Sequence, residues 1–428
     1  MKSILESARE LDSHDELRDF RDAFWIPPHK AGGQQAYFCG HSLGLQPRAA
    51  ESALQQEMER WRDQAVGGHF HGQPAWIDYG DELAAALAAL VGAQTAEVTV
   101  MNTLTVNLHL LMVSFYRPAG RRRKILIERG AFPSDRYAVA SQIRWHGLDP
   151  AECLVELAPR PGSRLLEEDD VEAWLQDHGD EVALVLWPGV QYASGQAFDL
   201  HRLVAAAHGA GACIGFDLAH SAGNLPLSLH DSGCDFAAWC TYKYLNGGPG
   251  AVAACFVHAR HADDSELPRF EGWWGNERQG RFRMEARFQP AAGAEAWQLS
   301  NPPILAMAPL RASLALFEAA GIERLRAKSR RLTGWLAEAI EAELGDVLEI
   351  LTPAAPERRG CQLSLRVRAG AGRGRQLYQH LAQQGVVTDW REPDILRVAP
   401  VPLYNRYQDA YEFLRQVGAW AATGGEVG

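Results

Sequence analysis

Phe216-Asp217-Leu218-Ala219-His220 and, further along, Thr241-Tyr242-Lys243-Tyr244-Leu245-Asn246-Gly247-Gly248-Pro249-Gly250 are the two stretches that decide the fold of this chain. In the first stretch an acidic residue closes an apolar strand. In the second a lysine stands between two tyrosines, just before a glycine-rich turn. Most lysines are exposed, but these aromatic neighbours predict that Lys243 is partly desolvated, which makes its amine a usable nucleophile.

A lysine and a carboxylate in this order are what a pyridoxal phosphate enzyme requires. The amine of Lys243 would form an imine with the aldehyde of the cofactor. The carboxylate of Asp217 would keep the pyridine nitrogen protonated, so that the ring accepts electrons from the substrate's α-carbon. The alternative is that Lys243 is a surface lysine and Asp217 an ordinary strand end. We predict the cofactor site, with both residues catalytic.

An alternation of apolar strands and helices surrounds these two stretches. We expect strands at 97–101, 124–128, 153–158, 182–188, 212–217, 235–239 and 251–257, with helices at 47–65, 76–91 and 104–114. Such alternation is typical of an α/β fold with a mostly parallel seven-stranded sheet covered on both faces. Ligands of these sheets gather at the carboxyl ends of the strands.

Three parts follow from this pattern. We predict an N-terminal arm at 1–45, a large domain at 46–310 and a smaller α+β domain at 311–428. A long helical run at about 304–343 leads into the small domain. Its expected strands are 348–352, 361–368, 386–390 and 394–398, and its expected helices are 374–384 and 407–421.

The composition of the chain limits the classes of protein to which it can belong. The 428 residues carry a net charge of −11, which argues against a general surface for nucleic acid or anionic membrane. The seven cysteines are odd in number and scattered, a usage typical of reduced thiols in a cytosol. No apolar run is long enough to span a bilayer, and the first residues lack the apolar core of a leader. We expect an untargeted cytoplasmic protein.

The motifs of this chain resemble those of kynureninases. The similarity runs in order from about Tyr37 to about Tyr404, and the motifs are Asn102-Thr-Leu-Thr-Val-Asn-Leu-His109, Phe132-Pro-Ser-Asp135, Gly215-Phe-Asp-Leu-Ala-His220, Tyr242-Lys-Tyr-Leu-Asn246, Gly272-Trp273 and Ser300-Asn-Pro-Pro303. The resemblance implies the pyridoxal-phosphate-dependent aminotransferase-like fold (fold type I, class-V-type). It also implies hydrolysis of L-kynurenine or 3-hydroxy-L-kynurenine to L-alanine and the matching anthranilate, in tryptophan catabolism and NAD biosynthesis.

The cofactor phosphate is expected at the start of the helix at 104–114, where backbone N–H groups lack partners. The resemblance assigns Leu104 and Thr105 to this phosphate, although a threonine here can also be a helix cap. It also implies that Phe132 stacks on the pyridine ring. The other cofactor residues that it implies are Pro133, Ser134, Asp135, Ser194, His220 and Tyr242, in addition to Asp217 and Lys243.

Several of these positions have a competing interpretation. Ser194 can be a turn serine, His220 a structural histidine and Phe132 a core residue. Tyr242 either holds the phosphate, donates a proton near the γ-carbonyl or simply packs.

The resemblance implies a homodimer with active sites at the subunit interface. By resemblance Trp273 and Asn301 would bind the cofactor in the neighbouring subunit's site, and Asn301 would also contact the substrate. Ordinary interface packing is the alternative for both. Ser42 and His69 are implied to contact substrate, and the alternatives are a turn serine and a loop histidine without a role. At His41 kynureninases usually have asparagine, and the role of this position stays open.

Arg397 interrupts the apolar run Ile395-Leu396-Arg397-Val398-Ala399. A buried guanidinium needs an anion. By resemblance this anion is the substrate carboxylate, and a structural ion pair is the alternative. We favour the substrate.

Three other kinds of function compete with this one. His69 and His71 raise the question of a metal, but no third ligand follows at a recognised spacing, so we predict no metal site. A cysteine desulfurase-like β-lyase of the same fold would need a reactive cysteine, for which Cys361 is the least implausible. A non-catalytic binder would not need Lys243, Asp217 and Arg397 together.

Overall fold

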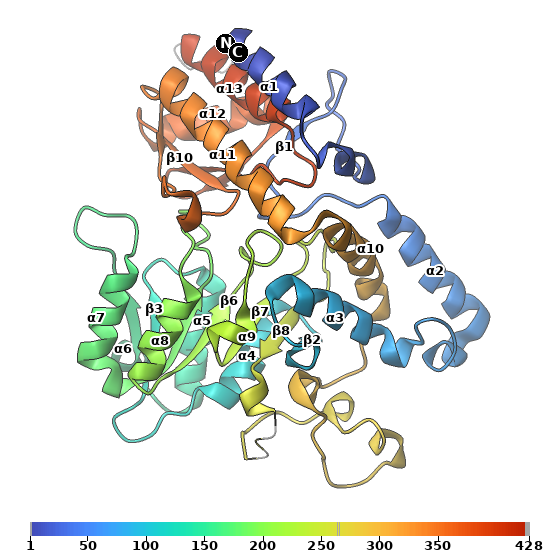
Figure 1. Ribbon diagram of the computed structural model, residues 1–428. Coiled ribbons are helices and arrows are strands. Elements are labelled where there is room, and N and C mark those ends of the chain that lie inside the picture. Colours follow the sequence, from blue (N-terminus) through green and yellow to red (C-terminus); the bar gives the residue numbers. More distant parts are fainter. Residues whose placement is uncertain (1, 263, 265, 424–428) are drawn as a thin grey trace.

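A seven-stranded sheet forms the centre of the large domain in the computed structural model, which describes residues 2–262, 264 and 266–423 (Figure 1). The strands are β2 (Val98–Val100), β3 (Lys124–Glu128), β4 (Leu154–Leu157), β5 (Val182–Pro188), β6 (Cys213–Asp217), β7 (Phe236–Trp239) and β8 (Ala254–Val257). Their order is β2-β8-β7-β6-β5-β3-β4. Only β8 pairs antiparallel with both neighbours, so the predicted mostly parallel sheet of this fold class is confirmed.

Helices cover both faces of this sheet. Successive residues of a strand point to opposite sides, so the apolar strands present side chains on both faces that must be covered. Ile125 and Ile127 of β3 pack with α4 (Leu104–Phe115) and α5 (Pro133–Trp145). Leu126, between them, belongs to the core on the other face. That second face is covered by α3 (Tyr79–Val91), α7 (Glu168–His178) and α8 (Leu200–Gly209). Two short helices, α6 (Pro150–Cys153) and α9 (Leu229–Ser232), complete the large domain.

The C-terminal part builds a four-stranded antiparallel sheet. Its order is β12-β13-β10-β9, from β9 (Leu348–Ile350), β10 (Leu363–Val367), β12 (Asp389–Arg391) and β13 (Ile395–Val398). The helices α11 (Ile322–Leu344), α12 (Ala371–Gln383) and α13 (Tyr407–Ala422) share its core. The strand expected at 386–390 is two strands, because β11 (Val386–Val387) leaves this sheet to pair with β1 (Ala36–Tyr37).

The N-terminal arm packs on the C-terminal part. The helix α1 (Lys2–Ser13) lies beside α13 (Figure 1). The carboxylate of Asp12 accepts the backbone N–H of Tyr407 at 2.7 Å, and Lys328 forms a 2.7 Å ion pair with Asp15. The domain bounds 1–45, 46–310 and 311–428 stay a prediction, and positions 424–428 lie outside the described residues.

The helical run expected at 304–343 is two helices. The helix α10 (Ile304–Ala320) packs on α2 (Ala49–Gln64) and ends at Gly321, where α11 begins after a bend of 78°. Gly321 has a φ of +75°, a conformation that glycine adopts without steric cost. Among the described residues no single helix has the length and apolar character needed to cross a membrane; α10 and α11 satisfy that test only when taken together as this bent pair.

Candidate active site

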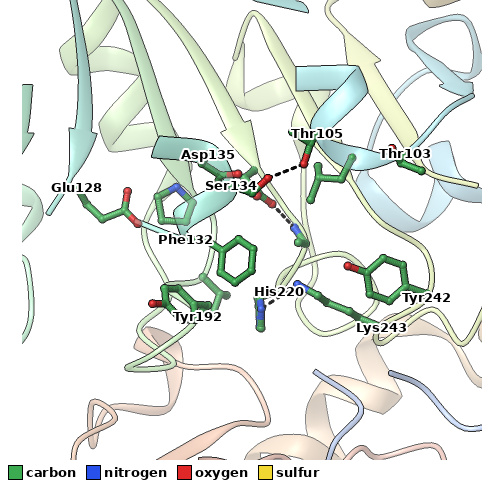
Figure 2. A pocket seen from close by; sticks show the side chains of 15 residues that line it. Thr103, Thr105, Glu128, Phe132, Ser134, Asp135, Tyr192, His220, Tyr242 and Lys243 are labelled. Carbon is green, nitrogen blue, oxygen red and sulfur yellow. Dashed lines mark hydrogen bonds between the residues drawn. The ribbon is translucent and has the colours of Figure 1, made fainter. Parts of the chain in front are cut away.

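A pocket opens at the carboxyl ends of the central strands, where a sheet of this kind binds its ligands (Figure 2). The strands β3, β5 and β6 contribute their last residues to it. The starts of α4 and α5 and the turn after β7 close its sides. The lining residues are Thr103, Leu104, Thr105, Glu128, Phe132, Ser134, Asp135, Pro188, Val190, Tyr192, Asp217, Ala219, His220, Tyr242 and Lys243.

The turn that carries Lys243 is held by backbone bonds on both sides. Asn246, in the left-handed conformation with a φ of 52°, returns the chain so that its N–H bonds the carbonyl of Lys243. The N–H of Gly44 donates to the carbonyl of Tyr242 at 2.8 Å. A Cβ on Gly44 would lie 2.3 Å from the carbonyl oxygen of Lys243. Glycine at position 44 therefore lets the N-terminal loop approach the lysine turn.

The amine of Lys243 points into the pocket. Its Nζ lies 3.1 Å from Nε2 of His220 and 5.8 Å from the ring centroid of Phe132. Burial, and then the charge of Lys243, lowers the pKa of His220 well below its usual value. A neutral imidazole accepts a hydrogen bond from an ammonium group. His220 is thus equipped to hold the lysine side chain without adding positive charge.

Three carboxyl groups lie buried on the opposite side of the pocket, at Glu128, Asp135 and Asp217. The Oδ1 atom of Asp217 accepts the N–H of Ala219 at 2.7 Å. Burial, and then the charge of Asp217, raises the pKa of Asp135 well above its usual value. Burial also raises the pKa of Glu128 to about 8. These raised pKa values favour the uncharged forms of Asp135 and Glu128 beside Asp217.

The start of α4 forms the other end of the pocket. Asn102 precedes it with a φ of 50°, a conformation that asparagine tolerates, and its side chain bonds Asn107 at 3.1 Å. The first backbone N–H groups of the helix are left without helical partners. The hydroxyls of Thr105 and Ser134 meet at 2.8 Å beside them. Thr103 is the N-cap residue, but its side chain makes no capping bond.

These features fit pyridoxal phosphate. A helix start with two hydroxyls suits a phosphate, and a buried carboxylate suits a protonated pyridine nitrogen. The exposed ring of Phe132 and the amine of Lys243 line the same pocket. The Oδ1 atom of Asp135 is buried without a hydrogen-bond partner, which leaves a polar group available to a ligand. When bound, this cofactor supplies an electron sink for the substrate's α-carbon.

The pocket unites most of the predicted cofactor residues. Pro133 begins α5 between the lining residues Phe132 and Ser134 and is exposed. Ser194 does not line the pocket, because its hydroxyl accepts the N–H of Gln196 in its own turn. Ser42 is half-buried outside the lining set.

Arg397 is 1% exposed and forms an ion pair with Asp389 at 2.7 Å. A structural ion pair was the predicted alternative to a substrate carboxylate, and the structure contains such a pair. The guanidinium also donates to the carbonyl of Tyr192 at 2.9 Å. This bond connects Arg397 to Tyr192, a residue that lines the pocket.

His69 and Trp273 lie together, away from this pocket. His69 ends the short helix η2 (Ala65–His69), and its ring lies 6.2 Å from that of Phe70. Phe70 contacts Phe282 at 5.9 Å, which in turn contacts Trp273 at 5.5 Å. We call these four residues the aromatic edge. Trp273 is 41% exposed, and Asn301 is exposed as well.

Sequence reasoning missed Glu128 and Tyr192. Glu128 ends a predicted strand of the parallel sheet, so its place at the carboxyl end was a usable signal. Tyr192 follows strand β5 in the same way. Its ring lies 5.2 Å from that of Phe132 at an angle of 82°.

Known proteins resemble this chain over nearly its whole length. The model of the kynureninase C-terminal domain matches residues 325–417. The kynureninase of Stenotrophomonas maltophilia (strain K279a) is 59% identical over 411 residues, covering 96% of this chain and 97% of that protein. The kynureninase of Xanthomonas euvesicatoria pv. vesicatoria (strain 85-10) is 59% identical over 413 residues, with the same coverage. The chain belongs to the kynureninase family.

Solved structures share the fold of this kynureninase family member at low identity. A cysteine desulfurase from Thermococcus onnurineus NA1 superposes with a TM-score of 0.75 at 18% identity, covering 91% of this chain and 95% of that one. The cysteine desulfurase CsdA from Escherichia coli gives 0.76 at 16% identity, covering 95% and 99%. The complex of the cystine C–S lyase C-DES with cysteine persulfide gives 0.75 at 18%, covering 90% and 97%. These likenesses establish the predicted fold class.

The desulfurase alternative is not favoured. Cys361 is fully buried, and burial raises its pKa to about 12. Its backbone N–H donates to Asn224, so it lies in a packed segment between the domains. A thiol in this state is a poor nucleophile. Sequence identity to kynureninases is also far higher than to the desulfurases.

One group in the described part of the chain has the composition of a metal site, namely Glu97, His230 and His258. Its polar atoms already have protein partners. Glu97 accepts the N–H of Ala259 and bonds His230 at 2.9 Å, while His258 accepts the N–H of Arg260. These bonds join the start of β2 to the end of β8. The group is accounted for as a buried hydrogen-bond network.

Proposed function

We propose that the protein hydrolyses L-kynurenine, 3-hydroxy-L-kynurenine or both to L-alanine and the matching anthranilate, with pyridoxal 5'-phosphate as cofactor. The observation that carries this proposal is the entry of Lys243 into a pocket that Asp217 and the start of α4 also line. The relatives that share nearly the whole chain are kynureninases. We assign the reaction to tryptophan catabolism and NAD biosynthesis, and the protein, with seven unpaired cysteines, to the cytoplasm.

We assign a separate role to several residues of the pocket. When the cofactor is bound, Lys243 would hold its aldehyde, and as a free amine it would take the substrate's α-proton and later return a proton. Asp217 would keep the pyridine nitrogen protonated, and Asp135 would support Asp217 by a hydrogen bond. Thr105, Ser134 and the first N–H groups of α4 would hold the phosphate.

The cleavage of the Cβ–Cγ bond needs water at the γ-carbonyl and a proton donor. Burial raises the pKa of Tyr242, so its phenol keeps its proton at neutral pH. We propose Tyr242 as that donor, next to the catalytic lysine. Arg397 binds the substrate α-carboxylate in exchange for part of its contact with Asp389, and Ser42 contributes a polar contact.

We further propose an obligate homodimer in which the aromatic edge and Asn301 complete the partner's site. None of these residues lines this chain's own pocket, which supports the proposal. A wide apolar groove beside α2 supports it too, since exposed patches of this kind mark interfaces. The exposed apolar residues of α2 and the segments near it are Trp25, Leu43, Leu54, Met58, Trp61 and Val66.

The activity is tested by adding L-kynurenine to purified protein with pyridoxal phosphate and measuring anthranilate fluorescence and L-alanine. The Lys243→Ala variant is the control and should lose at least about a thousandfold in rate. L-Cysteine as substrate tests the desulfurase alternative through sulfide release. Alanine from cysteine but not from kynurenine would contradict the proposal. Comparison of the two kynurenines gives the substrate preference.

The shared site is tested by mixing two inactive variants. A Lys243→Ala subunit paired with a Trp273→Leu subunit has one site with both native residues. Mixing should therefore restore activity at one of the two sites of each hybrid dimer, while each variant alone stays inactive. No recovery in a mixture that sedimentation shows to be a hybrid dimer would contradict the shared site, and a monomeric native protein would contradict the dimer.

A further inference from the structure

The loop at 191–196 connects the cofactor pocket with the sheet of the small domain. It follows β5 and is closed by its own hydrogen bonds. The side-chain oxygen of Gln191 accepts the N–H groups of Ala193 and Ser194 at 2.7 and 2.9 Å. The backbone N–H of Gln191 bonds Gln196, and that of Gly195 returns to Gln191. A turn with this many internal bonds moves as one unit.

One side of this loop is tied to the segment that carries Phe132. The Nε2 atom of Gln191 donates to the carbonyl of Gly130 at 2.9 Å, just before Phe132. The ring of Tyr192 meets the ring of Phe132 edge to face, at 5.2 Å. Edge-to-face contacts of this kind favour a defined ring orientation. The orientation of Phe132 is thus linked to the loop through both Gln191 and Tyr192.

The other side is tied to the small domain through three successive carbonyls. The carbonyl of Tyr192 accepts bonds from Gln362 at 3.0 Å and Arg397 at 2.9 Å. The carbonyl of Ala193 accepts the hydroxyl of Ser364 at 2.6 Å. The carbonyl of Ser194 accepts the hydroxyl of Thr352 at 2.6 Å.

These donors are buried, and the loop fits closely against them. Thr352, Gln362, Ser364 and Arg397 are each at most 5% exposed. A Cβ on Gly195 would come within 3.2 Å of Thr352 and Gln362. Loss of a buried donor leaves a carbonyl unsatisfied, which costs more than the hydrogen bond alone contributes. These bonds therefore hold the 191–196 loop in one position relative to the small domain.

We propose that the 191–196 loop is a strut that fixes the orientation of the Phe132 ring, with Gln191 and Tyr192 as positioning residues. The proposal deepens the function above and rests on it for the role of Phe132. Its consequence is that Thr352 and Ser364, which do not line the pocket, control the affinity for pyridoxal phosphate. They act through the loop, because each bonds a loop carbonyl and neither contacts the cofactor pocket.

The test uses a Thr352→Val/Ser364→Ala variant of the full chain. Pyridoxal phosphate is titrated into the cofactor-free protein, and the visible circular dichroism of the bound cofactor is recorded. We expect an affinity about tenfold lower, from the loss of the two hydroxyl bonds to the loop carbonyls, and a changed dichroism band. The matched control is Thr333→Val/Ser141→Ala, because these hydroxyls bond carbonyls of their own helices. Affinity and dichroism equal to the control's would overturn the proposal.

A double-mutant cycle tests the route through Phe132. In a Phe132→Leu background, the Thr352→Val/Ser364→Ala change should lower the affinity by less than about twofold, because the ring that the strut orients is gone. The same tenfold loss in both backgrounds would mean that the hydroxyls act by another path and would overturn the proposal. The folding of the double variant is judged by thermal unfolding of the cofactor-free protein. If the double variant does not fold, Ser364→Ala alone is used in both the native and the Phe132→Leu backgrounds.

These measurements need no substrate. A protein that shows the expected affinity changes but does not hydrolyse kynurenine would contradict the proposed function and leave the strut intact. A protein that hydrolyses kynurenine, but whose affinity for pyridoxal phosphate is the same in the variants, would support the proposed function and contradict the strut.

Discussion

The Nζ atom of Lys243 lies 3.1 Å from Nε2 of His220, and the imidazole is kept neutral by its surroundings. The lysine comes from the turn after β7 and the histidine from the segment after β6. Both reach the same pocket because the parallel strands β6 and β7 end at one edge of the sheet. The contact places a hydrogen-bond acceptor beside the amine that we propose as the catalytic group.

Replacement of His220 by leucine should weaken catalysis. The variant loses the acceptor that orients the lysine, so we expect kcat/KM for kynurenine to fall about tenfold to a hundredfold, the cost of a bond to a charged group. The matched control is His201→Leu, at an exposed position of α8. Steady-state kinetics of both variants check this. Equal losses of kcat/KM in the two variants would show that His220 has no specific role in catalysis.

Asp135 and Asp217 should respond differently to amidation. Burial, and then the charge of Asp217, raises the pKa of Asp135, which favours its uncharged form. Asp135→Asn should therefore cost less than about tenfold in kcat/KM, because the amide resembles the protonated acid. Asp217→Asn should cost about a thousandfold or more, because the charge that stabilises the pyridinium is lost. A reversed order in the kinetics would contradict this assignment.

Glu128 should make the stability of the cofactor-free protein depend on pH. Burial raises its pKa to about 8 in the folded state, whereas in the unfolded state it is about 4.3. The unfolded chain then binds fewer protons between these values, so stability is greatest below the lower value and is lost as pH rises toward about 8. Glu128→Gln should flatten this fall in the melting temperature. An unchanged slope would contradict a neutral buried Glu128.

Gly44→Ala should disturb the lysine turn. The added Cβ would lie 2.3 Å from the carbonyl oxygen of Lys243, which is backbone and has little room to move. We expect a loss of about 1–3 kcal/mol in the free energy of unfolding, together with weaker cofactor binding. The control is Gly80→Ala, where a Cβ meets nothing within 4 Å. Urea unfolding and cofactor titration distinguish the two.

Arg397 and Asp389 should show the cost of a broken buried pair. Asp389→Ala leaves the guanidinium of Arg397 without its carboxylate, and we expect a loss of about 3–5 kcal/mol in the free energy of unfolding. Arg397→Gln should in addition raise KM for kynurenine if the guanidinium binds the α-carboxylate. Urea denaturation gives the first effect and kinetics the second. An unchanged KM would leave Arg397 with a structural role alone.

Much of the site was within reach of the sequence because its chemistry requires unusual residues in order. Few kinds of site need both a lysine among aromatic residues and an acid at the end of a strand, and both Lys243 and Asp217 line the pocket. Glu128 was not predicted, because a glutamate followed by Arg129 resembles an ordinary charged strand end. Only the packing of β3 inside the sheet shows that its carboxyl is buried.

The amino-acid sequence by itself predicted the succession of strands and helices along the chain and Lys243 as the candidate cofactor lysine, because hydrophobic alternation and side-chain chemistry are local properties. The tertiary structure alone decided which distant segments share the pocket and which partners satisfy the buried groups. Asp389 beside Arg397, and the small-domain hydroxyls on the 191–196 loop, depend on contacts between residues far apart in the chain. Such contacts are set by how the two sheets pack, and no local pattern encodes them.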